Sequence, residues 1–152
     1  MMIRFILTIF IFINSYVFSQ NIFSEPIFFV GPMIHFNFGN KEHHFSYGVE
    51  GSAWVFNSNQ LPPLSADFGI EFEKAKIRVY SELQTGTLLG LSAGPVIEFE
   101  RDVDPRFGFQ SSVWGAFFLG LDMRYRRINK TNYFAPGIFF KVPVNPNQTS
   151  IF

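Results

Sequence analysis

The chain has 152 residues, 12 of them basic and 12 acidic, and it contains no cysteine. The length predicts one domain, and the balanced charge argues against a nucleic-acid binder that works through a basic surface. The absence of cysteine excludes disulfides, thiolate metal sites and a lipidated cysteine. Aromatic residues make up 19% of the chain and charged residues only 16%, whereas globular proteins carry roughly a quarter charged residues. The sequence therefore describes a protein that tolerates many bulky apolar groups and few charges.

Residues 1–19 have the pattern of a cleavable export signal. A short basic start at 1–4 precedes a mostly apolar run at 5–18, and small residues lead up to Ser19. This pattern predicts cleavage after Ser19, which leaves a mature domain of residues 20–152. The apolar run is shorter than the roughly 20 residues that a helix needs to span a bilayer. A retained anchor helix is the alternative interpretation of the same segment.

The clearest local signal is a hairpin around Lys74–Ala75. Polar and apolar residues alternate on both sides of this dipeptide, and the parity inverts at it. A turn at this position places Glu71 opposite Arg78, a favourable cross-strand pair. It also places Asp67 opposite Glu82, acid against acid, so this pair needs a cation from another strand.

Eight segments of the mature chain show the same alternation. They lie near 27–38, 44–56, 64–73, 76–84, 88–99, 107–115, 118–127 and 133–142. We therefore predict an all-β fold, a single antiparallel up-and-down β-barrel of about eight strands. Pro32, Pro95 and Pro136 fall inside these strands, and because proline lacks a backbone donor we expect a β-bulge at each.

The predicted strands have one polar and one apolar face, and alternation alone does not say which face points outward. A membrane barrel turns its apolar face outward to the lipid, whereas a soluble lipocalin-like barrel turns its apolar face inward. The interior of an eight-stranded barrel is only just wide enough for ordinary side chains, and the polar face is the one rich in glycine and serine. We therefore predict a transmembrane barrel with the apolar face outward; a soluble periplasmic barrel that binds an apolar ligand is the alternative. The charged residues of the polar face would form a network in the lumen: Glu50, Asp67, Glu71, Arg78, Glu82, Glu98, Asp122, Arg124, Arg126 and Lys141.

The connections between strands differ in charge from one side of the sheet to the other. Charged connections near 40–43, 73–76, 100–106 and 128–132 alternate with uncharged ones at 85–87 and 115–118. Because alternate connections of an up-and-down barrel lie on one side, we expect the charged set outside and both chain ends in the periplasm. Trp54 and Trp114 have the parity of the interior near strand ends, so they mark either a slip in register or a cap on the core.

In this pattern the chain resembles the small eight-stranded outer-membrane β-barrel proteins of Gram-negative bacteria. The resemblance covers about residues 27–142. It implies an outer-membrane location, reached through the cleaved signal peptide, with outer-membrane lipid as a partner. It also implies recognition by the outer-membrane assembly machinery, which reads aromatic residues at alternate positions of the last strand. Gly137, Phe140 and Val142 are the residues that would carry such a signal, although residues 145–152 extend beyond it.

A second resemblance concerns enzyme activity. His44 and Ser46 lie two residues apart and Glu50 lies four further on, so all three point to one side of a strand. This spacing is similar to that of outer-membrane lipid A deacylases, and it would imply Ser46 as nucleophile, His44 as base and Glu50 as the orienting acid. The residue after the serine is Tyr47, where that family has asparagine, and the motif lies in an early strand. A lipid A deacylase is therefore the alternative to our main interpretation, a barrel that is not an enzyme.

The main functional interpretation is a structural or interaction role, with the lumen closed by paired charges. Buried charges must be paired, so the charge network predicts a plug instead of a catalytic site. His43 and His44 are adjacent and point to opposite faces, and we predict no metal site and no cofactor. A protein partner is expected from the interaction role, but the sequence does not identify it, and we expect no nucleic acid.

Overall fold

The computed structural model describes residues 26–39, 42–55, 62–86, 88–116 and 118–144. The predicted signal peptide at 1–19 and the tail at 145–152 lie outside the described residues. Every described element is a strand: β1 (Ile27–Gly39), β2 (Glu42–Val55), β3 (Leu64–Glu73), β4 (Lys76–Gly86), β5 (Leu89–Glu100), β6 (Val103–Gly115), β7 (Leu119–Ile128), β8 (Thr131–Phe140) and β9 (Val142–Val144). No helix among the described residues is long and apolar enough to cross a membrane.

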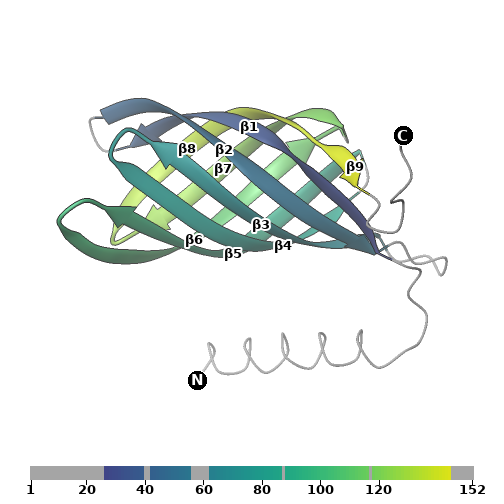
Figure 1. Ribbon diagram of the computed structural model, residues 1–152, viewed down its shortest axis with the longest axis horizontal. Helices are drawn as coiled ribbons and strands as arrows, with labels where there is room; N and C mark the ends of the chain where they lie inside the picture. Colours follow the sequence, from purple (N-terminus) through teal and green to yellow (C-terminus); the bar gives the residue numbers. More distant parts are fainter. Residues whose placement is uncertain (1–25, 40–41, 56–61, 87, 117, 145–152) are drawn as a thin grey trace, which may run out of the picture.

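The strands form one closed antiparallel sheet. Each strand from β1 to β7 pairs with the next in the chain, and β1 also pairs with β8 and β9, which closes the barrel. β8 and β9 keep a single register against β1 and are separated only at Lys141. Together they therefore form the eighth strand of the barrel. The predicted eight-stranded up-and-down barrel is confirmed. Figure 1 shows the start of β1 and the end of β9 at one end of the barrel and the β1–β2, β3–β4, β5–β6 and β7–β8 hairpins at the other. We call these the terminal end and the hairpin end.

The hairpin predicted at Lys74–Ala75 is present with the predicted register. Glu71 pairs with Arg78 and Asp67 with Glu82. Lys74 takes a positive φ of 49° in the turn. The β7–β8 hairpin turns through Asn129 and Lys130, both with positive φ, at 44° and 68°, as two-residue hairpin turns of type I′ require.

The bulges expected at the three prolines are not present, and this prediction is wrong. Pro32 pairs with β2, Pro95 with β6 and Pro136 with β7. On its other side each proline interrupts the ladder, which resumes in the same register. A strand residue directs its backbone donor toward one neighbour only, so a proline removes one bond without inserting a residue. Gly31 and Gly94 precede two of these prolines; a Cβ there would lie 1.7 and 1.8 Å from the carbonyl oxygen of the facing strand.

The β5–β6 hairpin differs most from the sequence-based expectation. β6 begins at Val103, four residues before the predicted start. The prediction began too late because the polar residues of this stretch resemble a loop in sequence. Its first residues pair only with β5, since pairing with β7 starts at Gly108. The described register shift lies here, between Glu98 and Glu100.

The two faces of the sheet have opposite chemistry. Phe107 and Leu89 point outward and are 72% and 76% exposed, whereas Arg78 and Arg126 point inward and are 0% exposed. The interior also contains a few apolar side chains, among them Met33, Val96 and Ile128. The barrel is therefore apolar outside and charged inside, the inverse of a water-soluble protein.

Candidate functional site

The interior of the barrel holds all ten charged residues that the sequence places in a lumen network. Each of them is at most 6% exposed. They come from β2, β3, β4, β5 and β7, with Lys141 between β8 and β9. Because every second residue of a strand points inward, side chains far apart in sequence meet across the lumen. We call these residues and their inward-facing polar partners the charge network.

Near the hairpin end, Arg78 is the centre of the charge network. Its Nη1 lies 2.7 Å from Glu73 Oε2 and 3.3 Å from Glu71 Oε1, and its Nε lies 2.8 Å from Glu98 Oε2. Arg106 reaches the other oxygen of Glu98, with Nη2 2.8 Å from Oε1. One guanidinium on β4 thus joins three carboxylates from its two neighbouring strands, β3 and β5, and the planar arginine head suits such multiple pairing.

In the middle of the barrel, Arg126 is the centre of a second group. Its Nη1 and Nη2 donate to the two oxygens of Glu71, the first bond being 2.8 Å long. The same guanidinium donates to Asn37 Oδ1 at 3.0 Å and to Gln110 Oε1 at 2.9 Å. Three side chains from three other strands therefore fix the buried Arg126 through four hydrogen bonds.

His35 links this group to the next one along the axis. Its Nε2 lies 2.9 Å from both oxygens of Asp122, and its Nδ1 lies 3.6 Å from Glu71 Oε2. Asp122 also accepts from Arg124 Nε at 2.6 Å. The contacts from the hairpin end to the middle of the barrel thus form one continuous set.

Toward the terminal end, Glu50 takes the central position. Its Oε2 accepts from Arg124 Nη2 at 2.7 Å and from the Tyr80 hydroxyl at 2.5 Å. Its Oε1 contacts Lys141 Nζ. Both oxygens of this carboxylate therefore have cationic or hydroxyl partners.

Of the facing acids Asp67 and Glu82, only Asp67 has a cation nearby. Lys141 Nζ lies 3.6 Å from Asp67 Oδ2. Glu82 is only 2% exposed, yet it is the one buried carboxylate of the described residues without a base within 4.0 Å, and its Oε1 has no hydrogen-bond partner. This corner of the charge network thus carries a buried acid without an ion-pair partner within 4.0 Å.

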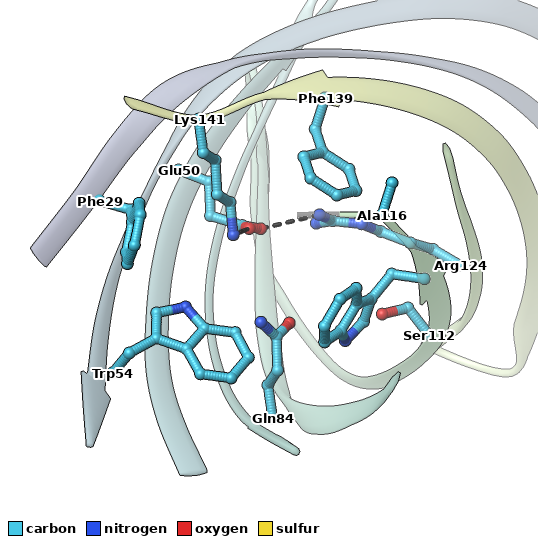
Figure 2. A pocket seen from close by; sticks show the side chains of 10 residues that line it. Phe29, Glu50, Trp54, Gln84, Ser112, Ala116, Arg124, Phe139 and Lys141 are labelled. Atoms are coloured by element: carbon cyan, nitrogen blue, oxygen red, sulfur yellow. Dashed lines mark hydrogen bonds and ion pairs between the residues drawn. The ribbon is translucent and has the colours of Figure 1, made fainter. Parts of the chain in front are cut away.

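Aromatic side chains close the terminal end of the lumen. The rings of Trp54 and Trp114 meet edge to face with centroids 5.8 Å apart, and Phe29 and Phe139 complete the inward-facing group. The two tryptophans therefore cap the core without a slip in register. Figure 2 shows the Lys141, Glu50 and Arg124 side chains in a row beside this cap. The free space between them is enough for only about one or two water molecules.

The structure separates the residues of the deacylase-like motif from any substrate in lipid. Ser46 is 1% exposed inside the barrel and accepts a hydrogen bond from Asn37 Nδ2 at 2.7 Å. Glu50 forms ion pairs with Arg124 and Lys141. His44 is partly exposed near the start of β2. The hydroxyl that would act as nucleophile therefore points away from the outer wall.

The described residues contain no group of three or more His, Asp or Glu arranged to hold a metal ion. The network also contains Glu73, His35 and Tyr80, which are not among the ten predicted charges; of these, His35 and Tyr80 lie on the polar face that the sequence predicts to point inward. Glu73 has the same parity as Glu71, so its inward direction could have been predicted, but its position beside the turn favoured a surface interpretation.

No protein-family model matches this chain, and no curated protein matches it. A solved structure described as "De novo design of transmembrane beta-barrels" matches over 78% of this chain and 98% of its own, with 17% sequence identity and a TM-score of 0.50. At this identity the likeness concerns the fold. The chain has the fold of a small eight-stranded transmembrane β-barrel.

Proposed function

We propose that this chain is an exported outer-membrane β-barrel with a structural or interaction role, and that its charge network closes the lumen. The observation that carries the proposal is the segregation of side chains: large apolar residues cover the outside, and the charged residues of the network lie inside, where all of them except Glu82 have an ion-pair partner. Soluble monomers rarely expose an apolar surface of this extent, whereas lipid is the natural solvent for it.

The filled interior supports a plug over a passage or a ligand pocket. Arg78, near the hairpin end, and Arg126, in the middle of the barrel, both contact Glu71 inside the lumen. A soluble barrel that binds an apolar ligand needs an apolar interior, and here the apolar face is outside. The deacylase alternative needs Ser46 at the lipid surface, and its hydroxyl points inward.

The orientation proposed from the sequence also agrees with the topology. The charged connections all belong to the hairpin end, and β1 and β9 start and finish at the terminal end. We place the hairpin end outside the cell and the terminal end in the periplasm. The signal peptide at 1–19 would supply the export step.

Fractionation of cells that express the full chain tests the proposal. We expect the protein in the outer-membrane fraction, with a band that changes mobility on a gel when the sample is heated. Recovery as a folded protein in the soluble periplasmic fraction would refute the membrane location.

Two further measurements test the proposed role. Vesicles that contain the purified barrel should conduct no more ions than protein-free vesicles, and a stable conductance would refute the plug. Lipid A from cells that express the wild-type chain or the Ser46→Ala variant should be identical, and a difference in acyl chains would favour the deacylase instead.

A further inference from the structure

The outer wall contains one charged residue that departs from its otherwise apolar character. Arg127 is the only Asp, Glu, Lys or Arg that points outward from a described strand, and it is exposed. It lies at the hairpin end of β7, between Phe109 of β6 and Asn132 of β8 in the same row of the sheet. The apolar outer band therefore meets a cation at this edge.

Other hydrogen-bond donors lie beside Arg127. Lys130 is exposed in the turn three residues further on. The Oδ1 of Asn132 accepts a hydrogen bond from the Tyr125 hydroxyl at 3.0 Å, which leaves the Nδ2 group of this amide as a further donor. Two cations and an amide donor thus lie within six residues of one another on the β7–β8 hairpin.

These cations have no acid of their own. Among the described residues, neither Arg127 nor Lys130 has a carboxylate within 4.0 Å. The arginines of the neighbouring β5–β6 hairpin differ in this respect, because Arg101 lies 3.7 Å from Asp102 and Arg106 contacts Glu100. The edge of β7 and β8 is therefore an unneutralised positive patch.

An apolar hollow in the outer wall begins one row below this patch. Tyr125 and Phe134 line it on the patch side, Leu83 lines the far side, and the small residues Ala93 and Ser111 lie between them. These five residues occupy one continuous row across β4 to β8, so the hollow follows the row where two small side chains replace large ones.

We propose that the outer wall of β4–β8 binds an anionic phosphate-bearing lipid, with its phosphate at Arg127, Lys130 and Asn132 and an acyl chain in the hollow. This inference rests on the proposed membrane location. A guanidinium binds phosphate through two parallel hydrogen bonds, and basic residues at a membrane edge attract anionic headgroups. The apolar hollow next to the donors selects a lipid over a free anion, because a free anion gains nothing from it.

The first experiment compares headgroups on the full mature barrel. The protein is reconstituted with equal amounts of dimyristoylphosphatidylglycerol and dimyristoylphosphatidylcholine, and the lipid retained on it is counted by native mass spectrometry. We expect the anionic lipid to be retained in roughly twenty-five-fold excess, since each of the two basic residues near the headgroup contributes about fivefold. Inorganic phosphate at millimolar concentration should not displace it, and displacement would assign the site to free phosphate and overturn the proposal.

A matched pair of variants locates the headgroup site. Arg127→Gln with Lys130→Gln should abolish the excess, whereas Lys74→Gln with Arg101→Gln removes the same charge from other hairpins of the same end and should leave it unchanged. Equal behaviour of the two double variants would overturn the assignment.

A second pair tests the hollow. Ala93→Phe fills it and should reduce the retained anionic lipid severalfold, whereas Ala66→Phe makes the same change on the outer wall of β3, outside the hollow, and should have no effect. The heat-dependent mobility of every sample shows whether the barrel has inserted. A barrel that fails to insert refutes the proposed membrane location, whereas an inserted barrel that retains both lipids equally refutes only this inference.

Discussion

Replacing Arg126 by methionine should remove the strongest single contributor to the charge network. Arg126 is fully buried and donates four hydrogen bonds, two of them to the carboxylate of Glu71. Breaking a buried pair by removing one partner typically costs about 3–5 kcal/mol, because the other charge stays behind uncompensated. Glu71 retains Arg78 at 3.3 Å and His35 at 3.6 Å, so we expect a loss of about 3 kcal/mol in the free energy of unfolding.

A double-mutant cycle separates pairing from packing. The Arg126→Met/Glu71→Gln variant removes both charges, and its loss should be smaller than the sum of the two single losses by roughly 2–3 kcal/mol. The adjacent Arg127→Met variant is the matched control, because the same chemical change occurs at an outward side chain without an ion pair. It should shift stability by no more than about 0.5 kcal/mol.

Urea titration of the barrel in phosphatidylcholine vesicles provides the measurement. Trp54 and Trp114 are the two tryptophans of the chain, and both lie in the cap of the lumen, so their fluorescence reports unfolding. Zwitterionic lipid keeps any headgroup contact at Arg127 from contributing. If Arg126→Met is no more destabilising than Arg127→Met, the charge network does not stabilise the barrel and the argument from buried pairing is wrong.

Three other changes follow from the same structure. Glu82→Gln removes the buried acid that has no base nearby and should leave the free energy of unfolding unchanged or raise it by about 1 kcal/mol; a clear loss in urea titration would show that this carboxylate has a partner. Val79→Arg places a charge on the outer wall and should cost about 2–4 kcal/mol in vesicles, whereas Ala75→Arg in the hairpin turn should cost about 0–1; equal effects would exclude lipid as the solvent of that wall. Trp54→Ala with Trp114→Ala empties the cap and should cost several kcal/mol, about 3–5 for each ring, without opening a conductance, because the charge network still crosses the lumen.

The inward or outward direction of each side chain follows from sequence because a strand has a period of exactly two residues. A hairpin with an unambiguous turn, such as the one at Lys74–Ala75, also fixes which residues face one another across one ladder. This is why the membership of the charge network could be predicted from parity. Local pairing rules were sufficient for that step.

The pairing inside the lumen could not be predicted in the same way. Asp122 reaches His35 across 87 residues, and Arg126 reaches Asn37 across 89. Such contacts depend on how far each strand is staggered when the sheet closes, and parity contains no information on stagger. The prolines show a related limit, because sequence reveals a missing donor but not which neighbour loses the bond. Only the closed sheet shows that each of them lies beside an interruption with an unchanged register.

The closing ladder between β1 and β9 has a consequence for chain connectivity. Phe28 is paired with Val144, so the first and last described strands are as close as any two neighbours in the sheet. A short linker between these two positions would complete a covalent ring, and the chain could then be cut at the Arg101–Asp102 tip without losing a single ladder bond. The fold therefore depends on the order of the strands around the barrel and not on which strand comes first in the chain.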